Sequence, residues 1–428
     1  MKRPSQSKKI KVGISIGDIN GVGLEVILKT FNDGRILDMC TPVVFCSNRA
    51  ASFYRKVLNF KNFNIHAIEH ATEARAKKFN VVNVWQDEFK IEPGQINEIG
   101  GKCALLSLEA ACASLKKGEV DVLVTAPINK HNIQSEKFNF PGHTEYLQDY
   151  FESKESLMFM VSDDLKIGVV TGHIPVTEIA TKISAKLIRE KLDLMEQSLK
   201  KDFMINKPKI AVLSLNPHAG DQGLIGKEDD DIVKPTIAKA MDDGKLVFGP
   251  YSADSFFGNG HYKNFDGVLA MYHDQGLIPF KTLTFNSGVN FTAGLPIIRT
   301  SPDHGSAHEI AGTNQASENS FRQAVYAAID LFYQREEQIE LESNVLKPES
   351  KALAKATKGR PNDGKRPSSP RGPKEEQPNK PTPRPRKDLA TSTSKEEEIE
   401  KAPSPKKEEK PQKQSDSESA PIEQSDKD

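Results

Sequence analysis

Residues 10–31 read IKVGISIGDINGVGLEVILKTF, and this stretch indicates the fold class of the chain. Ile10–Ile16 is a short apolar run rich in β-branched residues, which predicts a buried strand. Gly23–Phe31 places its apolar side chains at helical spacing, which predicts a helix. A strand that turns directly into a helix is the repeating unit of α/β proteins.

The same alternation continues along the chain. Short apolar runs predict strands at Ile10–Ile16, Pro42–Ser47, Asn64–Ile68, Val120–Ala126, Ile167–Thr171, Ile210–Leu215 and Asp266–Tyr272. Helical periodicity predicts helices at Gly23–Phe31, Arg49–Leu58, Ala104–Lys117, Ile183–Leu199, Lys227–Met241 and Ser317–Tyr333. Leu157–Ser162 and Lys166–Thr171 predict a hairpin around Asp163 and Asp164. We therefore expect an α/β fold with mixed sheets and helices on both sheet faces.

The glycines of the first turn do not form a dinucleotide-binding fingerprint. That fingerprint requires G-x-G-x-x-G and an acidic residue about 20 positions further on. Here Gly21-Val22-Gly23 is followed by Val26 in place of the third glycine, and no acid ends the second strand. Two interpretations stay open, a turn whose backbone N–H groups face a bound anion and a tight turn that only needs glycine.

The composition separates a globular part from a tail. Of 428 residues, the 78 from 351 to 428 hold 12 of the 26 prolines, 19 basic and 15 acidic residues, and no Phe, Tyr or Trp. Such a segment cannot bury enough apolar surface to offset its ordering entropy, so we expect 347–428 to be a disordered, solvated tail or a weak interaction arm. The remaining residues are sufficient for two domains.

Several protein classes are disfavoured. The globular part is slightly acidic, which argues against nucleic-acid binding through phosphate neutralisation. No apolar run approaches the ~18 residues of a membrane span, and the basic N-terminus lacks a signal-peptide core. The cysteines at 40, 46, 103 and 112 form no CxxC pair, so we expect buried thiols. These features predict a cytoplasmic protein without membrane or nucleic-acid partners.

Histidines follow several predicted strands. His173, His218 and His273 each lie at such a strand end, far apart in the sequence. Because ligands bind beyond the carboxyl ends of strands in open α/β sheets, the three could converge on one divalent metal ion. Spacing does not establish that convergence, and a single histidine in such a position more often has a structural or merely exposed role.

Other polar side chains occupy comparable positions. Lys281 and Arg299 are the only basic residues from 264 to 315, apart from histidine, and each follows an apolar run. This placement suggests positive charge held in a site, since a guanidinium matches carboxylate or phosphate. Asn290, in Gly288-Val289-Asn290, and Asp254, in Tyr251-Ser252-Ala253-Asp254, are further polar groups at strand ends. The alternative is that the aliphatic parts of the Lys281 and Arg299 side chains lie along the protein surface and their charged groups lie in water.

Seven motifs together carry a resemblance to a known family. They are TAPINK (125–130), GHTEYL (142–147), TGHIPV (171–176), LNPHAG (215–220), GPYSADSFF (249–257), DGVLAMYHDQGLIPFK (266–281) and GVNFTAGLPIIRTSPDHGSAHEIAG (288–312). In this order they resemble the 4-hydroxythreonine-4-phosphate dehydrogenase family of pyridoxal phosphate biosynthesis, over about residues 10–332.

The resemblance implies a fold like that of isocitrate and isopropylmalate dehydrogenases, which bind a nicotinamide cofactor without a Rossmann motif. It implies two α/β/α domains, which we place at 10–135 plus 265–340 and at 136–264. It also implies a homodimer with active sites shared between subunits. We expect His173 and His273 to come from different subunits of that dimer.

The family pattern also assigns roles to residues. It makes His173, His218 and His273 the ligands of one divalent ion per site (Zn, Co or Mg). It makes His143, Thr144, Lys281, Asn290 and Arg299 contacts of a small phosphorylated hydroxy amino acid. HGSAHEIAG resembles the cofactor loop of the family's fold, so His304, Gly305, Ser306, Ala307 and Glu309 are expected to bind NAD or NADP. We expect Lys281 and Asp254 to take part in catalysis.

This sequence departs from the family pattern in two places. The first turn usually reads T-P-G-E-P-x-G-I-G-P but here reads SIGDINGVGL, and the cofactor loop usually ends A-G-K-G but here ends Ala311-Gly312-Thr313-Asn314. The function implied is oxidation and decarboxylation of 4-phosphooxy-L-threonine to 3-amino-2-oxopropyl phosphate. Two alternatives stay open, a dehydrogenase of threonate or erythronate 4-phosphate and an inactive homologue that acts as a binding protein.

Overall fold

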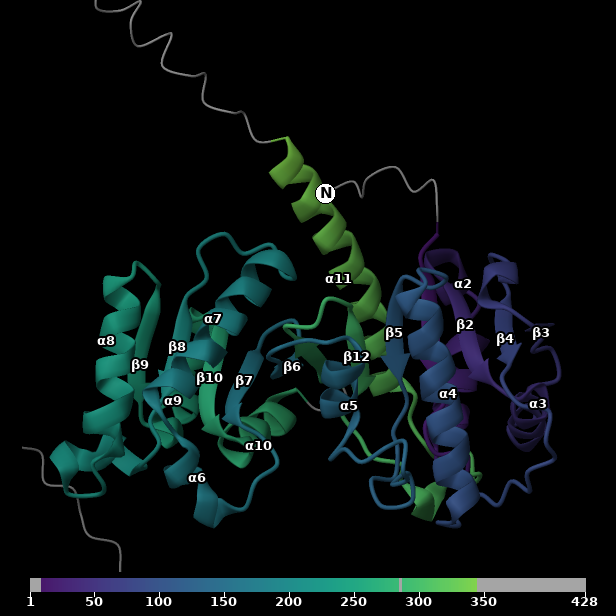
Figure 1. The fold of residues 1–428 in the computed structure, drawn as a ribbon, viewed down its shortest axis with the longest axis horizontal. Coiled ribbons are helices and arrows are strands. Elements are labelled where there is room, and N and C mark those ends of the chain that lie inside the picture. The colour runs from purple at the N-terminus through teal and green to yellow at the C-terminus, as the bar shows by residue number, and fades with distance from the viewer. Residues whose placement is uncertain (1–8, 285–286, 345–428) are drawn as a thin grey trace, which may run out of the picture. The chain divides into compact units, whose positions relative to one another are not determined.

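The computed structural model describes residues 9–284 and 287–344, and a single sheet of twelve strands runs through them. The strand order is β3-β4-β2-β1-β5-β12-β11-β6-β7-β10-β8-β9 (Figure 1). The strands are β1 (Lys11–Ser15), β2 (Thr41–Cys46), β3 (Ile65–Ile68), β4 (Phe79–Asn83), β5 (Val122–Thr125), β6 (Leu157–Val161), β7 (Lys166–Thr171), β8 (Ile210–Leu213), β9 (Val247–Tyr251), β10 (Gly267–Tyr272), β11 (Val289–Ala293) and β12 (Arg299–Pro302).

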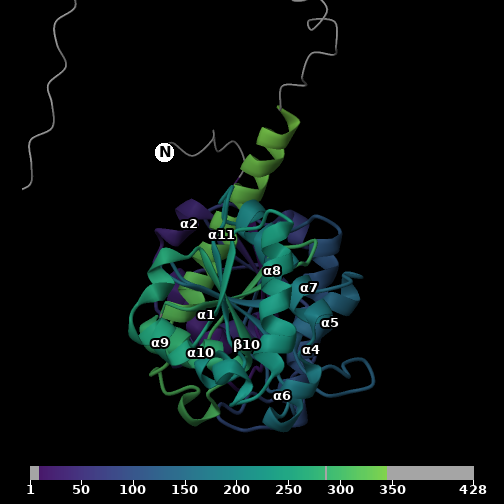
Figure 2. The same cartoon turned by 90° about the vertical axis from the view of Figure 1, so that its left-hand side faces the viewer.

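Helices flank the strands on both sides, as the edge-on view of the sheet shows (Figure 2). The α-helices are α1 (Gly23–Asn32), α2 (Ile36–Met39), α3 (Asn48–Val57), α4 (Glu98–Lys116), α5 (His143–Tyr150), α6 (Val176–Lys182), α7 (Ala185–Lys201), α8 (Lys234–Asp242), α9 (Ala253–Gly258), α10 (His273–Leu283) and α11 (Asn319–Ser343). Short single turns lie at 71–73, 217–223, 229–233, 261–264 and 308–310. The predicted α/β class with helices on both sheet faces is confirmed.

The sheet is mixed, as predicted. β11 runs antiparallel to β12 and β6, and β6 runs antiparallel to β7, whereas every other neighbouring pair of strands is parallel. The predicted hairpin is β6–β7, with Met160 opposite Ile167. The strands β2, β5 and β8 are buried along their whole length, which explains why they read as continuous apolar runs.

Four strands were not predicted, namely β4, β9, β11 and β12. β9 reads VFGPY, and its glycine and proline weaken the strand signal. β11 reads VNFTA and β12 reads RTSP, so neither contains the apolar run that was used to recognise strands. Tertiary pairing inside the sheet overrides weak local propensity at these positions.

The helices differ from their predicted ranges mainly at their ends. The helix expected at Ile183–Leu199 begins at Ala185, because the Ser184 hydroxyl accepts a hydrogen bond from the Leu187 amide and caps it. α4 begins at Glu98, earlier than predicted, where the Asn97 side chain caps it. α11 continues to Ser343, beyond the predicted end at Tyr333.

The described residues do not test the predictions about domain boundaries and the tail. The boundaries of the two predicted domains remain a prediction, and the predicted tail lies outside the described residues.

All four cysteines are buried, as predicted, and burial raises the pKa of Cys103 to about 12. Within the described ranges, every helix is too short or too polar to act as a transmembrane segment.

A buried ion pair joins α7 to α11. Arg335 Nε donates to Asp202 Oδ1 over 2.5 Å, and the Ser198 hydroxyl donates to Asp202 Oδ2 over 2.6 Å. The two charged side chains are only 11% and 3% exposed. Removing one member of such a pair leaves the other charge buried without its partner.

We predict that Asp202→Ala lowers the free energy of unfolding by about 3–5 kcal/mol, measured by urea denaturation. The control is Glu152→Ala, which breaks an exposed pair with Lys116 and should cost about 0–1 kcal/mol. Equal, small effects of the two substitutions would show that the buried pair does not hold α7 and α11 together.

Candidate active site

An open cleft of about 310 Å³ lies at the ends of the central strands. It is lined by residues from β5, α5, β6, α10, β11 and β12 and from the loops that follow β5, β7 and β12. The predicted site residues in its lining are His143, Thr144, His173, His273, Lys281, Asn290, Arg299, His304 and Gly305. Segments more than 150 residues apart in sequence thus meet in one cavity.

Arg299 is a buried cation in this cleft. Its side chain donates to the hydroxyl of Thr125 on β5, from Nε over 3.1 Å and from Nη2 over 2.7 Å, and from Nη1 to the Thr292 hydroxyl on β11 over 3.2 Å. Burial lowers the pKa of Arg299 to about 10, against an opposing effect of the nearby Glu145. At neutral pH the group is still charged, so its site favours an anionic ligand.

Three buried polar atoms of the predicted site lack a hydrogen-bond partner among the described residues. They are His143 Nε2, Asn290 Oδ1 and His304 Nε2. Burial, followed by the charges of Arg299 and Lys130, holds the pKa of His143 well below its usual value, so its imidazole is neutral. Unpaired buried polar atoms are uncommon, and their position around one cavity is typical of a ligand site.

Two of the predicted metal ligands face each other. The ring centroids of His173 and His273 lie 5.1 Å apart in one chain. His273 Nδ1 is 2.7 Å from Asp274 Oδ1, which leaves Nε2 free for a ligand. Burial lowers the pKa of His173, followed by the charges of Lys130 and His273. Two imidazole rings so placed fit part of a divalent metal site. The expectation that these two residues come from different subunits is therefore wrong.

The third predicted ligand lies elsewhere. His218 follows β8 and is exposed outside the cleft, and no group of three His, Cys, Asp or Glu side chains within 9–284 and 287–344 could hold a metal ion. The His218 amide and the Asp254 carboxylate both bond the Ser252 hydroxyl, over 3.3 and 2.6 Å. That hydroxyl is the main cause of the lowered pKa of Asp254. The Ser252 hydroxyl thus links the His218 backbone to the Asp254 carboxylate, apart from His173 and His273.

The backbone around His218 is strained. His218, Ala219, Asp221 and Gln222 all have positive φ, between 43° and 56°. Each such residue costs about 1–2 kcal/mol relative to the right-handed conformation, unless it is glycine. Strain of this kind concentrates at functional sites, where surrounding contacts hold it.

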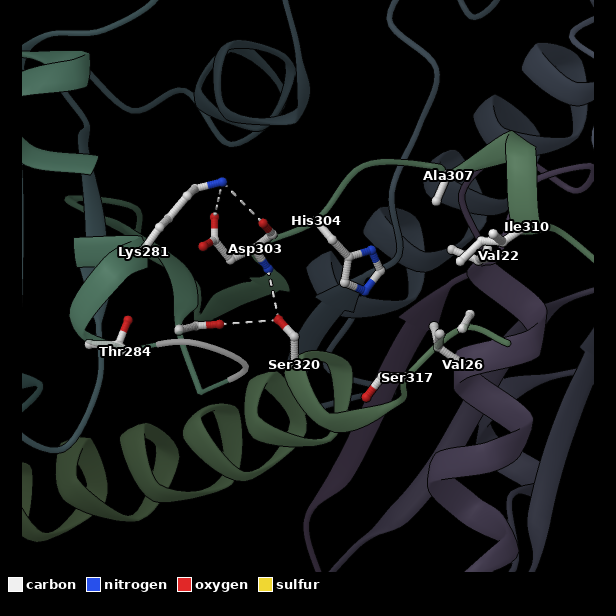
Figure 3. Close-up of a pocket in the computed structure, with 12 residues that line it drawn as sticks. Val22, Val26, Lys281, Thr284, Asp303, His304, Ala307, Ile310, Ser317 and Ser320 are labelled. Carbon is white, nitrogen blue, oxygen red and sulfur yellow. Dashed lines mark hydrogen bonds and ion pairs between the residues drawn. The ribbon is translucent and has the colours of Figure 1, made fainter. Parts of the chain in front are cut away.

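Lys281 connects the cleft to a second cavity of about 350 Å³. Its Nζ lies 3.0 Å from Asp303 Oδ1 and 3.3 Å from the Asp303 carbonyl oxygen (Figure 3). His304 also lines both cavities, and Figure 3 shows its ring between Lys281 and the apolar side chains of Val22, Val26 and Ile310. The second cavity thus joins an apolar wall to the polar cleft.

The predicted cofactor loop forms one side of this second cavity through His304 and Ala307. Ser306 and Glu309 line neither cavity. The Ser306 carbonyl accepts from the Val22 amide over 3.0 Å, and a Cβ on Gly21 would lie 2.7 Å from that oxygen. The glycine is therefore needed for close approach of two backbone segments.

The backbone amides of the first glycine turn donate hydrogen bonds to other groups of the protein. The amides of Asp18, Asn20 and Gly21 bond the Pro127 carbonyl, the Asp18 carboxylate and the Asp18 carbonyl respectively. The Val22 amide donates to the Ser306 carbonyl oxygen. None of these four amides is therefore available to bind an anion. Of the two open interpretations, the structure supports the tight turn.

Asp18 also anchors the cofactor loop. Its fully buried carboxylate accepts from Asn20 N, from Asn132 Nδ2 over 2.8 Å, and from His308 Nε2 over 3.2 Å. His308 Nδ1 in turn lies 3.1 Å from the Ser306 hydroxyl. The tautomer with its proton on Nε2 donates to Asp18 and accepts from the Ser306 hydroxyl at Nδ1. The chain Asp18–His308–Ser306 thus ties the loop to the glycine turn.

Sequence reasoning missed several residues of the site. Lys130, Glu145 and Asp303 line the cleft, and Asp18 and His308 fix its neighbouring loop. Lys130, Glu145, Asp303 and His308 all fall inside the quoted motifs, which is the signal that could have found them. Their roles depend on contacts across the fold, which the motifs do not encode.

The chain resembles proteins of one family. The family described as "Pyridoxal phosphate biosynthetic protein PdxA" matches residues 38–328. A 4-hydroxythreonine-4-phosphate dehydrogenase from Bacteroides thetaiotaomicron is 52% identical over 333 residues, which cover 77% of this chain and 91% of that protein. A relative from Oceanobacillus iheyensis, 34% identical over 76% of this chain and 98% of its own, has the provisional name D-threonate 4-phosphate dehydrogenase.

The fold is also found in a solved structure. The 4-hydroxythreonine-4-phosphate dehydrogenase of Klebsiella pneumoniae superposes with a TM-score of 0.66 at 31% identity, over 76% of this chain and 99% of that one. The predicted family and fold class are both confirmed.

We predict that His308→Ala speeds backbone hydrogen exchange in residues 304–311 and lowers the free energy of unfolding by about 1–3 kcal/mol. The reason is that a buried carboxylate loses one of three donors. The control is His131→Ala, an exposed histidine outside the network. Unchanged exchange in the loop would show that the Asp18–His308 contact does not hold it.

Proposed function

The chain belongs to the 4-hydroxythreonine-4-phosphate dehydrogenase family of oxidoreductases, and on that basis we propose that it oxidises 4-phosphooxy-L-threonine with NAD or NADP and a divalent metal ion. The observation that supports this proposal is the cleft, in which the buried Arg299 lies with the unpaired atoms of His143 and Asn290. A buried guanidinium with neutral partners is suited to a substrate that carries phosphate and carboxylate groups.

The reaction removes a hydride and a proton from the secondary alcohol. The resulting β-keto acid loses its carboxylate as CO₂, and the enolate that remains takes up a proton to give 3-amino-2-oxopropyl phosphate. Arg299 and Lys281 hold the anionic groups of the substrate, and His143, Thr144 and Asn290 orient it by hydrogen bonds. Which cation meets phosphate and which meets carboxylate stays open. Lys281 lines both cavities, and we propose that it exchanges a proton with the reacting alcohol.

The residues that would hold the metal and the cofactor are present. His173 and His273, with His218, would bind a divalent ion that supplies Lewis-acid activation of the alcohol. A nicotinamide cofactor, which accepts the hydride, would lie against the loop of His304 and Ala307 and its apolar wall. His304 Nε2, buried and unpaired, fits a polar group of that cofactor.

We further propose a homodimer with shared sites. His173 and His273 form one part of the metal site, whereas His218 lies apart beside Asp254. His218 of the partner subunit would complete the site, and Asp254 of the partner subunit would accompany it. This arrangement needs each chain to contribute to both sites of the dimer.

A second substrate is favoured by one observation, the provisional D-threonate name of the Oceanobacillus relative. That substrate and erythronate 4-phosphate differ from 4-phosphooxy-L-threonine in carrying a hydroxyl in place of the amine. The same metal and anion anchors would serve all three compounds.

The test is a substrate panel with purified enzyme. We predict that kcat/KM is highest for 4-phosphooxy-L-threonine among the three four-carbon phosphates, with NADH or NADPH formation as the readout. Higher kcat/KM for threonate or erythronate 4-phosphate would favour the second substrate class. No turnover on any compound, together with no bound metal, would favour an inactive homologue.

The shared metal site predicts a pattern of rescue between inactive variants. His173→Ala, His218→Ala and His273→Ala should each abolish turnover and lower the bound metal content. Mixing His173→Ala with His218→Ala and re-associating the subunits should restore roughly a quarter of wild-type activity, because half of random dimers are mixed and each has one intact site.

The pair His173→Ala and His273→Ala is the matched control. Both residues belong to the same half of the site, so no mixed dimer rebuilds an intact one. Recovery in this control, or its absence from verified mixed dimers of the first pair, would refute the proposed division of ligands.

A further inference from the structure

A separate cavity of about 440 Å³ lies between α7, α11, the end of α5 and the loop that joins β11 to β12. We call it the α7–α11 cavity. It shares no lining residue with the cleft or with the second cavity beside the predicted cofactor loop. Its volume falls in the range of sites for small molecules, about 300–1,000 Å³. The α7–α11 cavity is therefore a place for a ligand other than the substrate or the nicotinamide cofactor.

Arg335 brings unused hydrogen-bond donors to this cavity. The residue is only 9% exposed, and its Nε donates to Asp202 Oδ1. The other Asp202 oxygen accepts from the Ser198 hydroxyl. The two terminal amino groups of Arg335 have no hydrogen-bond acceptor within residues 9–284 and 287–344. Because buried donors without an acceptor are uncommon, these two groups are left for a ligand.

Two further groups in the lining are also unengaged. The Lys201 ammonium and the Gln197 amide have no hydrogen-bond or ion-pair partner in the described part of the chain. The carboxylates of the cavity are both occupied, since Asp202 pairs with Arg335 and Glu152 lies 3.8 Å from Lys116. Lys201 thus carries a positive charge that has no counter-ion in the cavity.

Local structure accounts for only part of this arrangement. Lys201 is the last residue of α7, where a cation interacts favourably with the helix dipole. The pair of Asp202 and Arg335 connects two helices. Neither role uses the terminal amino groups of Arg335 or needs an open cavity beside them. Water could satisfy these donors, and the experiment below distinguishes water from a bound anion.

We propose that the α7–α11 cavity binds a phosphate group, either inorganic phosphate or a small phosphate monoester. The terminal amino groups of Arg335 present two parallel donors that match two phosphate oxygens. Lys201 and Gln197 supply charge and a donor for a further oxygen. A planar carboxylate would occupy the guanidinium and leave the other two groups without a partner. The site is separate from the cleft, so this inference does not depend on the proposed function.

The experiment titrates inorganic phosphate into the full chain and follows methyl resonances by NMR at constant ionic strength. Leu194 and Leu295 line the α7–α11 cavity, whereas Met158 and Met160 line the cleft. Their methyl groups therefore report on the two cavities separately. Glycerol 3-phosphate and acetate are titrated in parallel, because they distinguish a monoester from inorganic phosphate and a phosphate from a carboxylate.

The variants test the lining without breaking the buried ion pair. Lys201→Ala removes the unpaired charge, and Gln197→Glu adds a carboxylate at an exposed position of the lining. Lys200→Ala is the matched control, since it removes the same charge from the neighbouring position of α7, outside the cavity. Arg335 is kept, because its loss would leave the Asp202 charge buried without its partner. Thermal unfolding verifies that each variant folds.

We expect the Leu194 and Leu295 resonances of the wild type to shift saturably with phosphate or with glycerol 3-phosphate. Lys201→Ala should weaken this binding by about 5-fold, as for a partly exposed charge contact. Gln197→Glu should weaken it by about 10-fold or more, because the new carboxylate repels the anion. Lys200→Ala should bind like the wild type, and acetate should leave both leucines unshifted.

Three results would overturn the inference. A response confined to Met158 and Met160 would show that phosphate binds the cleft only. Leucine shifts that are the same in the wild type, Lys201→Ala and Gln197→Glu would show that the proposed lining does not hold the anion. An absence of any leucine response to phosphate and glycerol 3-phosphate would show that water satisfies the donors of Arg335. None of these results bears on turnover in the cleft, so the proposed function is tested independently.

Discussion

The site depends on one buried charge, the guanidinium of Arg299. An ionised group removed from water costs several kcal/mol unless other groups compensate it. Here the sheet supplies that compensation, because β12 lies between β5 and β11 and each neighbour presents a threonine hydroxyl to the guanidinium. These hydroxyls accept hydrogen bonds from the guanidinium of Arg299 but do not neutralise its positive charge. The charge that remains without a counter-ion among these partners favours an anionic ligand in the cleft.

The mixed centre of the sheet places several residues of the cleft on one face. Side chains alternate between the two faces of a strand, so Arg299 and Ser301 of β12 share a face. Asn290 lies opposite Ser301 in the antiparallel ladder and also lines the cleft. Val289, Phe291 and Ala293 of β11 are buried on the other face. One short antiparallel pair thus brings several ligand-binding groups to one surface.

The same alternation limits what the sequence can predict. Strands such as β1, β5 and β10 are buried on both faces and are easily recognised by their apolar runs. β11 and β12 place polar residues on the ligand face, so their strand signal is weak even though the motifs around Asn290 and Arg299 mark them as functional. The fold class and lining residues such as Asn290 and Arg299 were therefore predictable. The pairing of the histidines was not, because spacing along the chain does not reveal which ends of the sheet face each other.

The first turn of the chain and the predicted cofactor loop are physically connected. The first turn has Ile16, Ile19 and Leu24 where the family usually has proline, and proline stabilises a turn by restricting the unfolded chain. In this protein the turn is held instead by hydrogen bonds to the buried Asp18 carboxylate, one of which comes from His308 in the cofactor loop. The glutamate of α1 adds a second link, because Glu25 accepts from the amides of Gly312 and Ala316. These contacts join segments almost 300 residues apart, which makes the geometry of the predicted cofactor loop depend on the first turn of the chain.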